Sequence, residues 1–197
     1  MAQTILITGG AGFIGSHVVR RFVNRYPEKK ILNLDLLTYA GNLENLRDIE
    51  QAPNYTFIKG DIADQSFVKS VFEQYHPDGV INLAAESHVD NSIRNPKIFL
   101  ETNVMGVQAL INVLSHNPNS ELIQISTDEV YGEVMSGHSL ESDVLNPSSP
   151  YSASKAGAEL LLMSAQRTYG LKVRITRGSN TYGQGQFPEK KIGRAHV

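Results

Sequence analysis

Short apolar runs alternate with longer amphipathic segments along this chain, and this alternation favours parallel strands joined by helices. The apolar runs, each predicted to be a strand, lie at 5–8, 31–35, 55–59, 80–83, 122–126 and 172–177. The amphipathic segments, each predicted to be a helix, lie at 13–26, 43–50, 65–75, 96–115 and 152–170. We therefore expect a parallel sheet with helices covering both of its faces. The segment 137–150 is the one long loop.

The first apolar run passes directly into a loop in which Gly9, Gly12 and Gly15 are spaced three apart. In such a loop the first glycine allows a sharp turn, the second lets a pyrophosphate approach the backbone, and the third lets the helix pack on the sheet. The N–H groups that open the following helix attract the anion. Taken alone the loop is equally a tight turn, but its place between strand and helix favours dinucleotide binding.

Asp35 ends the second predicted strand, twenty residues after Gly15. A carboxylate at this place accepts hydrogen bonds from the adenosine ribose and repels a 2′-phosphate, and Leu36 and Leu37 offer no compensating cation. The pattern favours NAD over NADP. It also predicts a doubly wound α/β sheet of Rossmann type with strand order 3-2-1-4-5-6, a further strand being left open.

The composition of the chain limits the kinds of partner that it is expected to bind. The chain has 197 residues, 41% of them hydrophobic, and a net charge of −2 without a long basic run, so neither nucleic acid nor a membrane is an expected partner. It has no cysteine, and its histidines lack metal-ligand spacing, so no metal site is expected. No apolar stretch approaches the ~20 residues of a membrane span. We expect a cytoplasmic protein.

The strongest catalytic signal is the pair Tyr151-x-x-x-Lys155, whose side chains lie one helical turn apart. An ammonium beside the phenol is expected to lower the tyrosine pKa and make it a usable acid and base. Such a pair alone is usually a solvated helix face. Behind a nucleotide loop, and with Ser126 and Thr127 ending the fifth strand, the catalytic interpretation is favoured.

Gly9-x-x-Gly12-x-x-Gly15, Asp35, Asp61 and Tyr151-x-x-x-Lys155 resemble the extended short-chain dehydrogenase/reductase superfamily. Within it, the dTDP-glucose 4,6-dehydratase family of deoxysugar biosynthesis is similar in four segments, 35–42, 84–90, 126–132 and 186–190. The resemblance runs from Ile5 to Lys190. Its most specific part is Thr127-Asp128-Glu129, because related epimerases tend to carry small hydroxyl residues or alanine at the two acidic positions.

The resemblance implies a lyase that uses NAD and a nucleotide sugar. Tyr151 would take the proton of the sugar 4-hydroxyl, which Thr127 orients, while hydride passes to NAD. Glu129 would then remove the proton on carbon 5, and a protonated Asp128 would donate to the departing 6-hydroxyl. Two neighbouring carboxyls can divide the roles in this way because their pKa values separate. The hydride finally returns to carbon 6.

The resemblance also implies two sets of binding residues and a homodimer for the full-length protein. The cofactor-binding set is Gly9, Gly12, Phe13, Ile14, Gly15, Asp35, Asp61, Ile62, Ala84, Ala85, Thr102, Tyr151 and Lys155. The substrate-binding set is Ser87, Asn180, Glu189 and Lys190. Two members have alternatives that stay open. Asp61 fits a strand-end cap equally well, and Thr102 fits helix packing.

Two other functions stay open. A nucleotide-sugar epimerase or decarboxylase would share the first oxidation, but Thr127-Asp128-Glu129 argues against it. A non-catalytic dinucleotide-binding protein would keep the glycine loop without needing Tyr151 and Lys155.

The resemblance divides the chain into three parts. Residues 1–177 are the expected NAD-binding domain with the catalytic residues, and 178–190 begin a substrate-binding lobe that is largely missing. Residues 191–197 do not continue the family pattern, and their Ile-Gly-Arg-Ala-His-Val resembles a translated sequencing adapter, so an artefactual tail is expected. The chain as written is therefore expected to be inactive.

Overall fold

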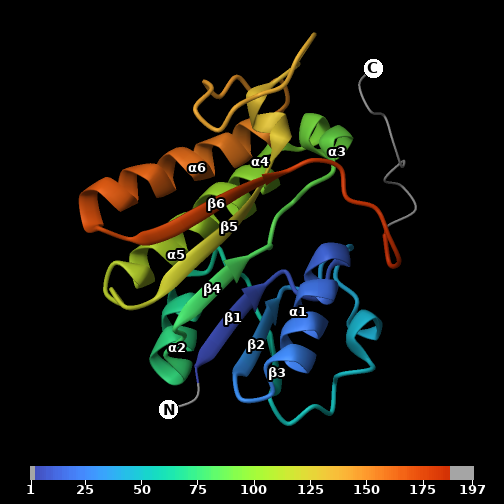
Figure 1. Ribbon diagram of the computed structural model, residues 1–197, viewed down its shortest axis with the longest axis vertical. Coiled ribbons are helices and arrows are strands. Elements are labelled where there is room, and N and C mark those ends of the chain that lie inside the picture. The colour runs from blue at the N-terminus through green and yellow to red at the C-terminus, as the bar shows by residue number, and fades with distance from the viewer. Residues whose placement is uncertain (1–2, 187–197) are drawn as a thin grey trace.

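The computed structural model describes residues 3–186 and contains a six-stranded parallel sheet between layers of helices (Figure 1). The strands are β1 (Thr4–Thr8), β2 (Lys30–Asp35), β3 (Tyr55–Lys59), β4 (Gly79–Asn82), β5 (Glu121–Thr127) and β6 (Lys172–Gly178). Their order is β3-β2-β1-β4-β5-β6, with all neighbours parallel. This confirms the predicted doubly wound fold, and residues 3–186 hold no further strand in the sheet.

The α-helices are α1 (Phe13–Arg25), α2 (Gln65–Tyr75), α3 (Val89–Arg94), α4 (Pro96–Phe99), α5 (Gly106–Leu114) and α6 (Pro150–Tyr169). Two 3-10 turns, η1 (Leu43–Leu46) and η3 (Asp128–Tyr131), and a π-helical segment, η2 (Leu100–Met105), complete the elements. Among these described helices, none is long and apolar enough to cross a bilayer.

Three helix predictions need correction. The segment 96–115 is not one regular helix, because η2 interrupts it between α4 and α5. The segment 43–50 forms only the short turn η1, and α3 was not predicted at all. Short elements of this kind bury too few residues to leave a clear periodic signal in the sequence.

Two hydrophobic cores lie on the two faces of the sheet, because successive strand residues point to opposite sides. Leu6 and Leu32 belong to the core shared with α2, α5 and α6. Their neighbours Ile7 and Ile31 belong to the core shared with α1. The apolar runs of the sequence therefore serve both faces at once.

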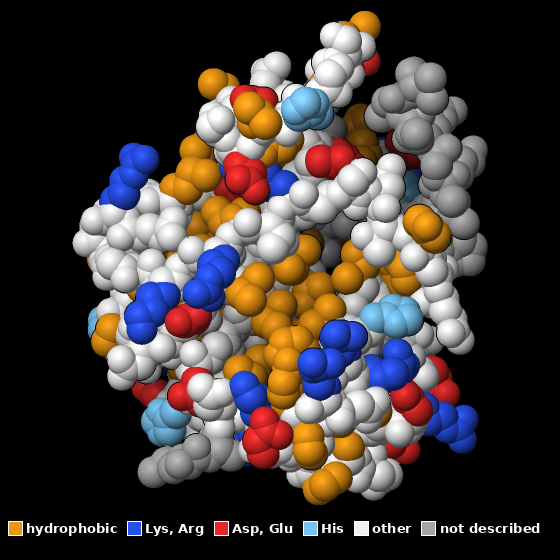
Figure 2. Space-filling model, viewed as in Figure 1, with side chains coloured by type: hydrophobic (Ala, Val, Ile, Leu, Met, Phe, Trp, Pro, Cys, Tyr) orange, Lys and Arg blue, Asp and Glu red, His pale blue; other side chains and the backbone are white. Residues whose placement is uncertain are grey.

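One face of the sheet at β5 and β6 departs from the expected covering by helices. On the face that α1 covers, no described helix lies over β5 and β6, and Figure 2 shows hydrophobic side chains gathered there. Ile123 and Ile125 of β5 are only partly buried on this side. The expectation of helices over both faces holds for the half of the sheet that contains β1, β2 and β3.

Caps fix where two important helices begin. The Asp64 carboxylate accepts hydrogen bonds from the backbone N–H groups of Ser66 and Phe67, both at 3.0 Å, and so caps the start of α2. At α6, Ser149 and Ser152 form a capping box, with each side chain accepting from the other residue's N–H at 3.1 and 3.0 Å. The second cap sets the position of Tyr151 within the first turn.

Candidate active site

A cavity of about 260 Å³ opens at the carboxyl edge of the sheet, where the strand order reverses between β1 and β4. This is the place where open α/β sheets bind ligands. Ser87 of the predicted substrate-binding set lines it. So does every residue of the predicted cofactor-binding set, which is Gly9, Gly12, Phe13, Ile14, Gly15, Asp35, Asp61, Ile62, Ala84, Ala85, Thr102, Tyr151 and Lys155. Residues far apart in sequence thus meet in one cavity.

The glycine loop is shaped by close backbone contacts. Gly9 has a φ of +69°, and a Cβ there would lie 2.6 Å from the backbone nitrogen of Ala84. A Cβ at Gly15 would collide with the carbonyl oxygen of Gly9. A Cβ at Gly12 would meet only the Gly9 and Ala40 oxygens, at 3.4 and 3.9 Å, so the bare backbone of Gly12 borders open space in the cavity. This cradle fits a pyrophosphate group.

Asp35 is held rigidly at the end of β2. One carboxylate oxygen accepts from the N–H of Ala11 at 2.9 Å, and the other accepts from the N–H of Leu37 at 2.8 Å. The side chain is 8% exposed and lines the cavity. Since each carboxylate oxygen can accept more than one hydrogen bond, Asp35 keeps capacity for two ribose hydroxyls.

Asp61 and Ile62 lie beyond the end of β3. An oxygen of Asp61 accepts from the N–H of Ala63 at 2.8 Å, which is the capping role, and Asp61 also borders the cavity. Ile62 is buried, and its side chain fills the space where a Cβ of Gly106 would lie. Both interpretations of Asp61 therefore stay compatible with the geometry.

Thr102 lines the cavity from η2, whereas its neighbour Asn103 acts as an internal brace. The Asn103 amide accepts from the N–H of Glu86 and donates to the carbonyl of Glu86, both at 2.9 Å. It also donates to the hydroxyl of Ser154 on α6 at 2.8 Å. The loop after β4 and the helix that carries Tyr151 are tied together at this point.

The cavity is also lined by residues outside the predicted binding sets, among them Tyr39 and Glu86. Burial raises the pKa of the Glu86 carboxyl, and a hydrogen bond with Tyr39 opposes that rise. Tyr39 comes from the loop after β2 and Glu86 from the loop after β4, so their contact joins the two sides of the cavity. The polar stretch that follows Asp35 was the available signal.

Tyr151 and Lys155 both line the cavity, but their electrostatics differ from the prediction. The pKa of Tyr151 is raised to about 12, first by burial and then by the nearby charge of Glu129, while a hydrogen bond with Thr127 lowers it. The Lys155 ammonium donates to the carbonyl oxygen of Ile125 at 2.7 Å. The expected lowering of the tyrosine pKa by Lys155 is therefore not found in this structure.

Lys155 itself is almost fully buried, at 5% exposure. Burial lowers its pKa to about 8, and the carboxylate of Glu159, one turn further along α6, opposes this effect. A lysine in this state is protonated at neutral pH but close to losing its charge.

The acidic turn η3 lies beside Tyr151. Thr127 caps the turn by accepting from the N–H of Glu129 at 3.2 Å, and its hydroxyl donates to Asp128 at 3.3 Å. Asp128 and Glu129 are exposed and do not line the cavity, yet both raise the Tyr151 pKa by their charge. The structure thus brings the five predicted catalytic residues into one neighbourhood.

The predicted substrate residues are less clearly gathered. Ser87 lines the cavity, whereas Asn180 is exposed and does not. Glu189 and Lys190 lie outside the described residues. Within residues 3–186 no group of three or more acidic or histidine side chains could hold a metal ion.

Two residues that line the cavity each carry a buried polar atom without a hydrogen-bond partner within the described protein, the hydroxyl of Ser126 and Nδ1 of His88. Buried polar atoms are nearly always paired, so an unpaired one in a residue that lines a cavity indicates a partner that a ligand or a water supplies. With the glycine cradle and Asp35, they make the residues of this cavity a good fit for a dinucleotide.

The chain matches the family described as GDP-mannose 4,6 dehydratase over residues 6–197. It is 46% identical to the dTDP-glucose 4,6-dehydratase of Salmonella typhimurium, an alignment that covers 95% of this chain. It spans 57% of the length of that relative, and likewise of the Escherichia coli and Shigella flexneri dehydratases.

Solved structures agree in fold. A dTDP-glucose 4,6-dehydratase from Streptomyces venezuelae, crystallised with NAD bound, has a TM-score of 0.90 and 46% identity, with 95% of this chain and 59% of that one covered. A UDP-glucose 4-epimerase from Thermotoga maritima has a TM-score of 0.86 and 33% identity, covering 97% and 60%. The fold is therefore shared by dehydratases and epimerases alike.

Proposed function

Since the chain belongs to the GDP-mannose 4,6-dehydratase family, we propose that the full-length protein is an NAD-dependent dTDP-glucose 4,6-dehydratase. The observation that carries the proposal is the acidic turn Asp128-Glu129 beside the half-buried phenol of Tyr151. An epimerase needs an acid and base at carbon 4 only. Removal of water across carbons 5 and 6 requires two further carboxyls next to the group that acts at carbon 4.

The binding part of the proposal rests on the cavity. Gly9, Gly12 and Gly15 would hold the pyrophosphate, Asp35 the adenosine ribose, and Lys155 the nicotinamide ribose. Bound NAD would supply a positive charge, a hydride acceptor for carbon 4 and, once reduced, the hydride donor for carbon 6.

The chain's own residues would move the protons. Thr127 would orient the 4-hydroxyl while Tyr151 takes its proton, and the resulting ketone makes the hydrogen on carbon 5 acidic. Glu129 would take that proton, and Asp128 would give one to the 6-hydroxyl, so that one water leaves. Because the raised pKa keeps the Tyr151 phenol protonated in the free protein, the proton transfer depends on charge that arrives with the ligands.

Mass spectrometry of the product tests the proposal on the full-length protein. Incubation with dTDP-glucose should give a product lighter by one water with no net NADH. A product of unchanged mass with an inverted hydroxyl would identify an epimerase and overturn the proposal. Binding of NAD without any product would favour the non-catalytic alternative.

Two variants separate the proposed roles. Tyr151→Phe should abolish the first oxidation, whereas Asp128→Asn should permit it and stop at elimination, so that bound NADH accumulates. Absorbance of NADH in a single turnover distinguishes the two. If both variants stop at the same step, the division of roles between Tyr151 and Asp128 is wrong.

The assembly of the full-length protein is a separate proposal. The resemblance to the superfamily implies a homodimer, and light scattering on the full-length protein measures it. A nucleotide sugar, rather than a nucleic acid or a membrane, is the partner that this function needs.

A further inference from the structure

The two segments that carry the proposed proton-transfer groups run side by side away from the cavity. On α6, Tyr151, Lys155 and Glu159 are spaced four residues apart and therefore lie along one helix face. On the other segment, Asp128 and Glu129 open the turn η3 and Tyr131 ends it. Near the cavity the two segments meet through the hydrogen bond between Thr127 and Tyr151.

At the far end, a single guanidinium joins the same two segments. Arg177 of β6 donates from Nε and Nη2 to one oxygen of Glu159, at 2.9 and 2.7 Å. Its Nη1 donates to the hydroxyl of Tyr131 at 2.6 Å and to the carbonyl of Glu141 at 3.0 Å. The guanidinium also lies 4.8 Å from the centre of the Tyr131 ring.

This ion pair is deeply enclosed. The Glu159 side chain is fully buried and that of Arg177 is 11% exposed. A planar guanidinium presents its donors in a fixed fork, so the position of Glu159 dictates where the Tyr131 hydroxyl can lie. Because η3 is only four residues long, a shift of Tyr131 is passed directly to Asp128 and Glu129.

We propose that Arg177 is a positioning residue that holds the acidic turn η3 against α6, through Tyr131 and Glu159, in the geometry that elimination requires. The inference rests on the proposed dehydratase function. Proton transfer is sensitive to position, and a misplacement of about 1 Å can cost roughly 100-fold in rate. Arg177 itself does not line the cavity.

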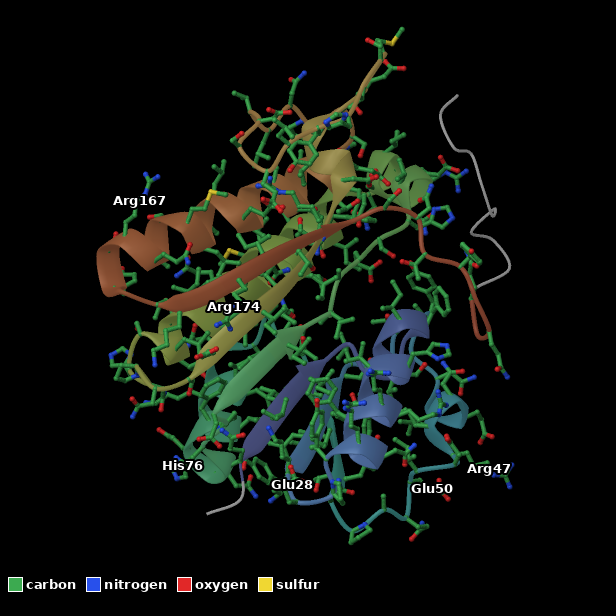
Figure 3. The ribbon with its side chains drawn as sticks, viewed as in Figure 1. Glu28, Arg47, Glu50, His76, Arg167 and Arg174 are labelled. Atoms are coloured by element: carbon green, nitrogen blue, oxygen red, sulfur yellow. The ribbon has the colours of Figure 1, made fainter. Side chains whose placement is uncertain are left out.

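The alternative is that the pair only stabilises the fold. Arg174 offers a matched control on the same strand, since it pairs with Glu121 at 2.7 Å but is 70% exposed (Figure 3). Figure 3 shows it near the start of β6, away from the carboxyl edge that carries the site. Arg174→Lys should leave turnover unchanged.

Tyr131→Phe in the full-length protein is the decisive variant, because it keeps the ring over Arg177 and removes only the hydroxyl bond. We expect kcat for dehydration to fall by about tenfold. We expect KM and NAD affinity to stay close to those of the parent. Bound NADH should accumulate in the steady state, because the first oxidation uses groups outside η3 while elimination uses Asp128 and Glu129.

Arg177→Lys provides the second arm, since the ammonium still neutralises Glu159 but cannot reach both partners in the same geometry. It should cause the same NADH accumulation, and adding Tyr131→Phe to it should cause little further loss, because both changes remove one shared contact. Independent, multiplying losses would contradict that shared contact.

Parent-like kcat and no NADH accumulation in both single variants, measured well below their unfolding temperatures, would overturn the inference. A purely structural role predicts that outcome, with only the unfolding temperature lowered. Failure of the proposed function is seen earlier and separately, because the parent itself would then release no dehydrated product. In that case the inference about elimination falls with it.

Discussion

The nucleotide half of the molecule, built on β1, β2 and β3, and the catalytic half, built on β4, β5 and β6, make their sites in different ways. In the nucleotide half the cavity is shaped by backbone. Gly9 and Gly15 leave no room for a side chain, and both oxygens of Asp35 are fixed by backbone N–H groups. In the catalytic half the site depends on charge, with the pKa values of Tyr151 and Lys155 moved in opposite directions by burial.

The difference has a physical consequence. A site made by backbone contacts tolerates almost no change of shape, whereas a site made by buried charges responds to pH and to each neighbouring charge. We therefore expect shape-changing substitutions to have their largest effects in the nucleotide half, and charge and pH effects to concentrate in the catalytic half.

The largest effect is expected for Gly15→Ala. The new Cβ would collide with the carbonyl oxygen of Gly9, which is backbone and cannot rotate away. Overpacking costs about 1–3 kcal/mol even where side chains can adjust, so a clash with backbone should weaken NAD binding by about 3 kcal/mol or more. Calorimetric titration with NAD measures it, and Gly178→Ala is the control because a Cβ there meets nothing within 4 Å. Parent-like affinity in Gly15→Ala would remove the basis of the comparison.

The next effect concerns Asp35→Asn, which keeps the shape and removes the charge. The amide nitrogen would face the N–H of Ala11 or Leu37, and a charge-assisted bond to the ribose is worth on the order of 1.5–3 kcal/mol. NAD should bind more weakly by about that amount, and the preference over NADP should shrink. Titration with both cofactors tests it against Asp143→Asn, where an exposed carboxylate accepts from Leu140 at 2.8 Å. Equal affinity of the parent for NAD and NADP would contradict the role of Asp35.

A pH effect of intermediate size is expected at Lys155. Its pKa is about 8 in the folded protein against an ordinary 10.5, so between these values the unfolded state binds more protons. The free energy of unfolding should then rise with pH in this window, by roughly 1–3 kcal/mol relative to Lys155→Met. Urea unfolding of both proteins at pH 8 and pH 10 measures the difference. A difference that stays constant would show that Lys155 is not buried as a charge.

The smallest effects compare two helix caps. Ser149→Ala on α6 and Asp64→Ala on α2 should each cost about 1 kcal/mol of stability, because each removes bonds to orphan N–H groups. In the full-length protein only Ser149→Ala should also lower turnover, since α6 carries Tyr151. Equal turnover in the two variants would mean that the first turn of α6 holds its place without the cap.

The same contrast explains how much could be predicted from the sequence. Buried parallel strands must be apolar on both faces, so runs such as 5–8 and 31–35 located the sheet and its order correctly. The glycine spacing and Asp35 located the cavity, because only a few residue types suit those backbone positions. Here local sequence and final structure carry the same information.

The catalytic half was less predictable because distant contacts decide it. The spacing of Tyr151 and Lys155 placed them on one helix face, but no local pattern shows that the ammonium bonds to the carbonyl of Ile125 on β5. Burial then reverses the expected direction of the tyrosine pKa. In the sequence, Glu159 looks like an ordinary helix charge and Arg177 like an ordinary strand charge. Only the fold brings the two side chains together.

The π-helical segment η2 has a consequence for how relatives of this chain are aligned. A π turn closes its hydrogen bond over one more residue than an α turn does, so the buried faces of α4 and α5 are out of phase along the sequence. The extra residue lets Thr102 face the cavity while Asn103 braces Glu86 and Ser154. A relative with one residue fewer between 100 and 105 could keep both flanking helices and lose this brace. A one-residue gap in an alignment at this place therefore marks a change in the site, while the helices on either side stay in register with the fold.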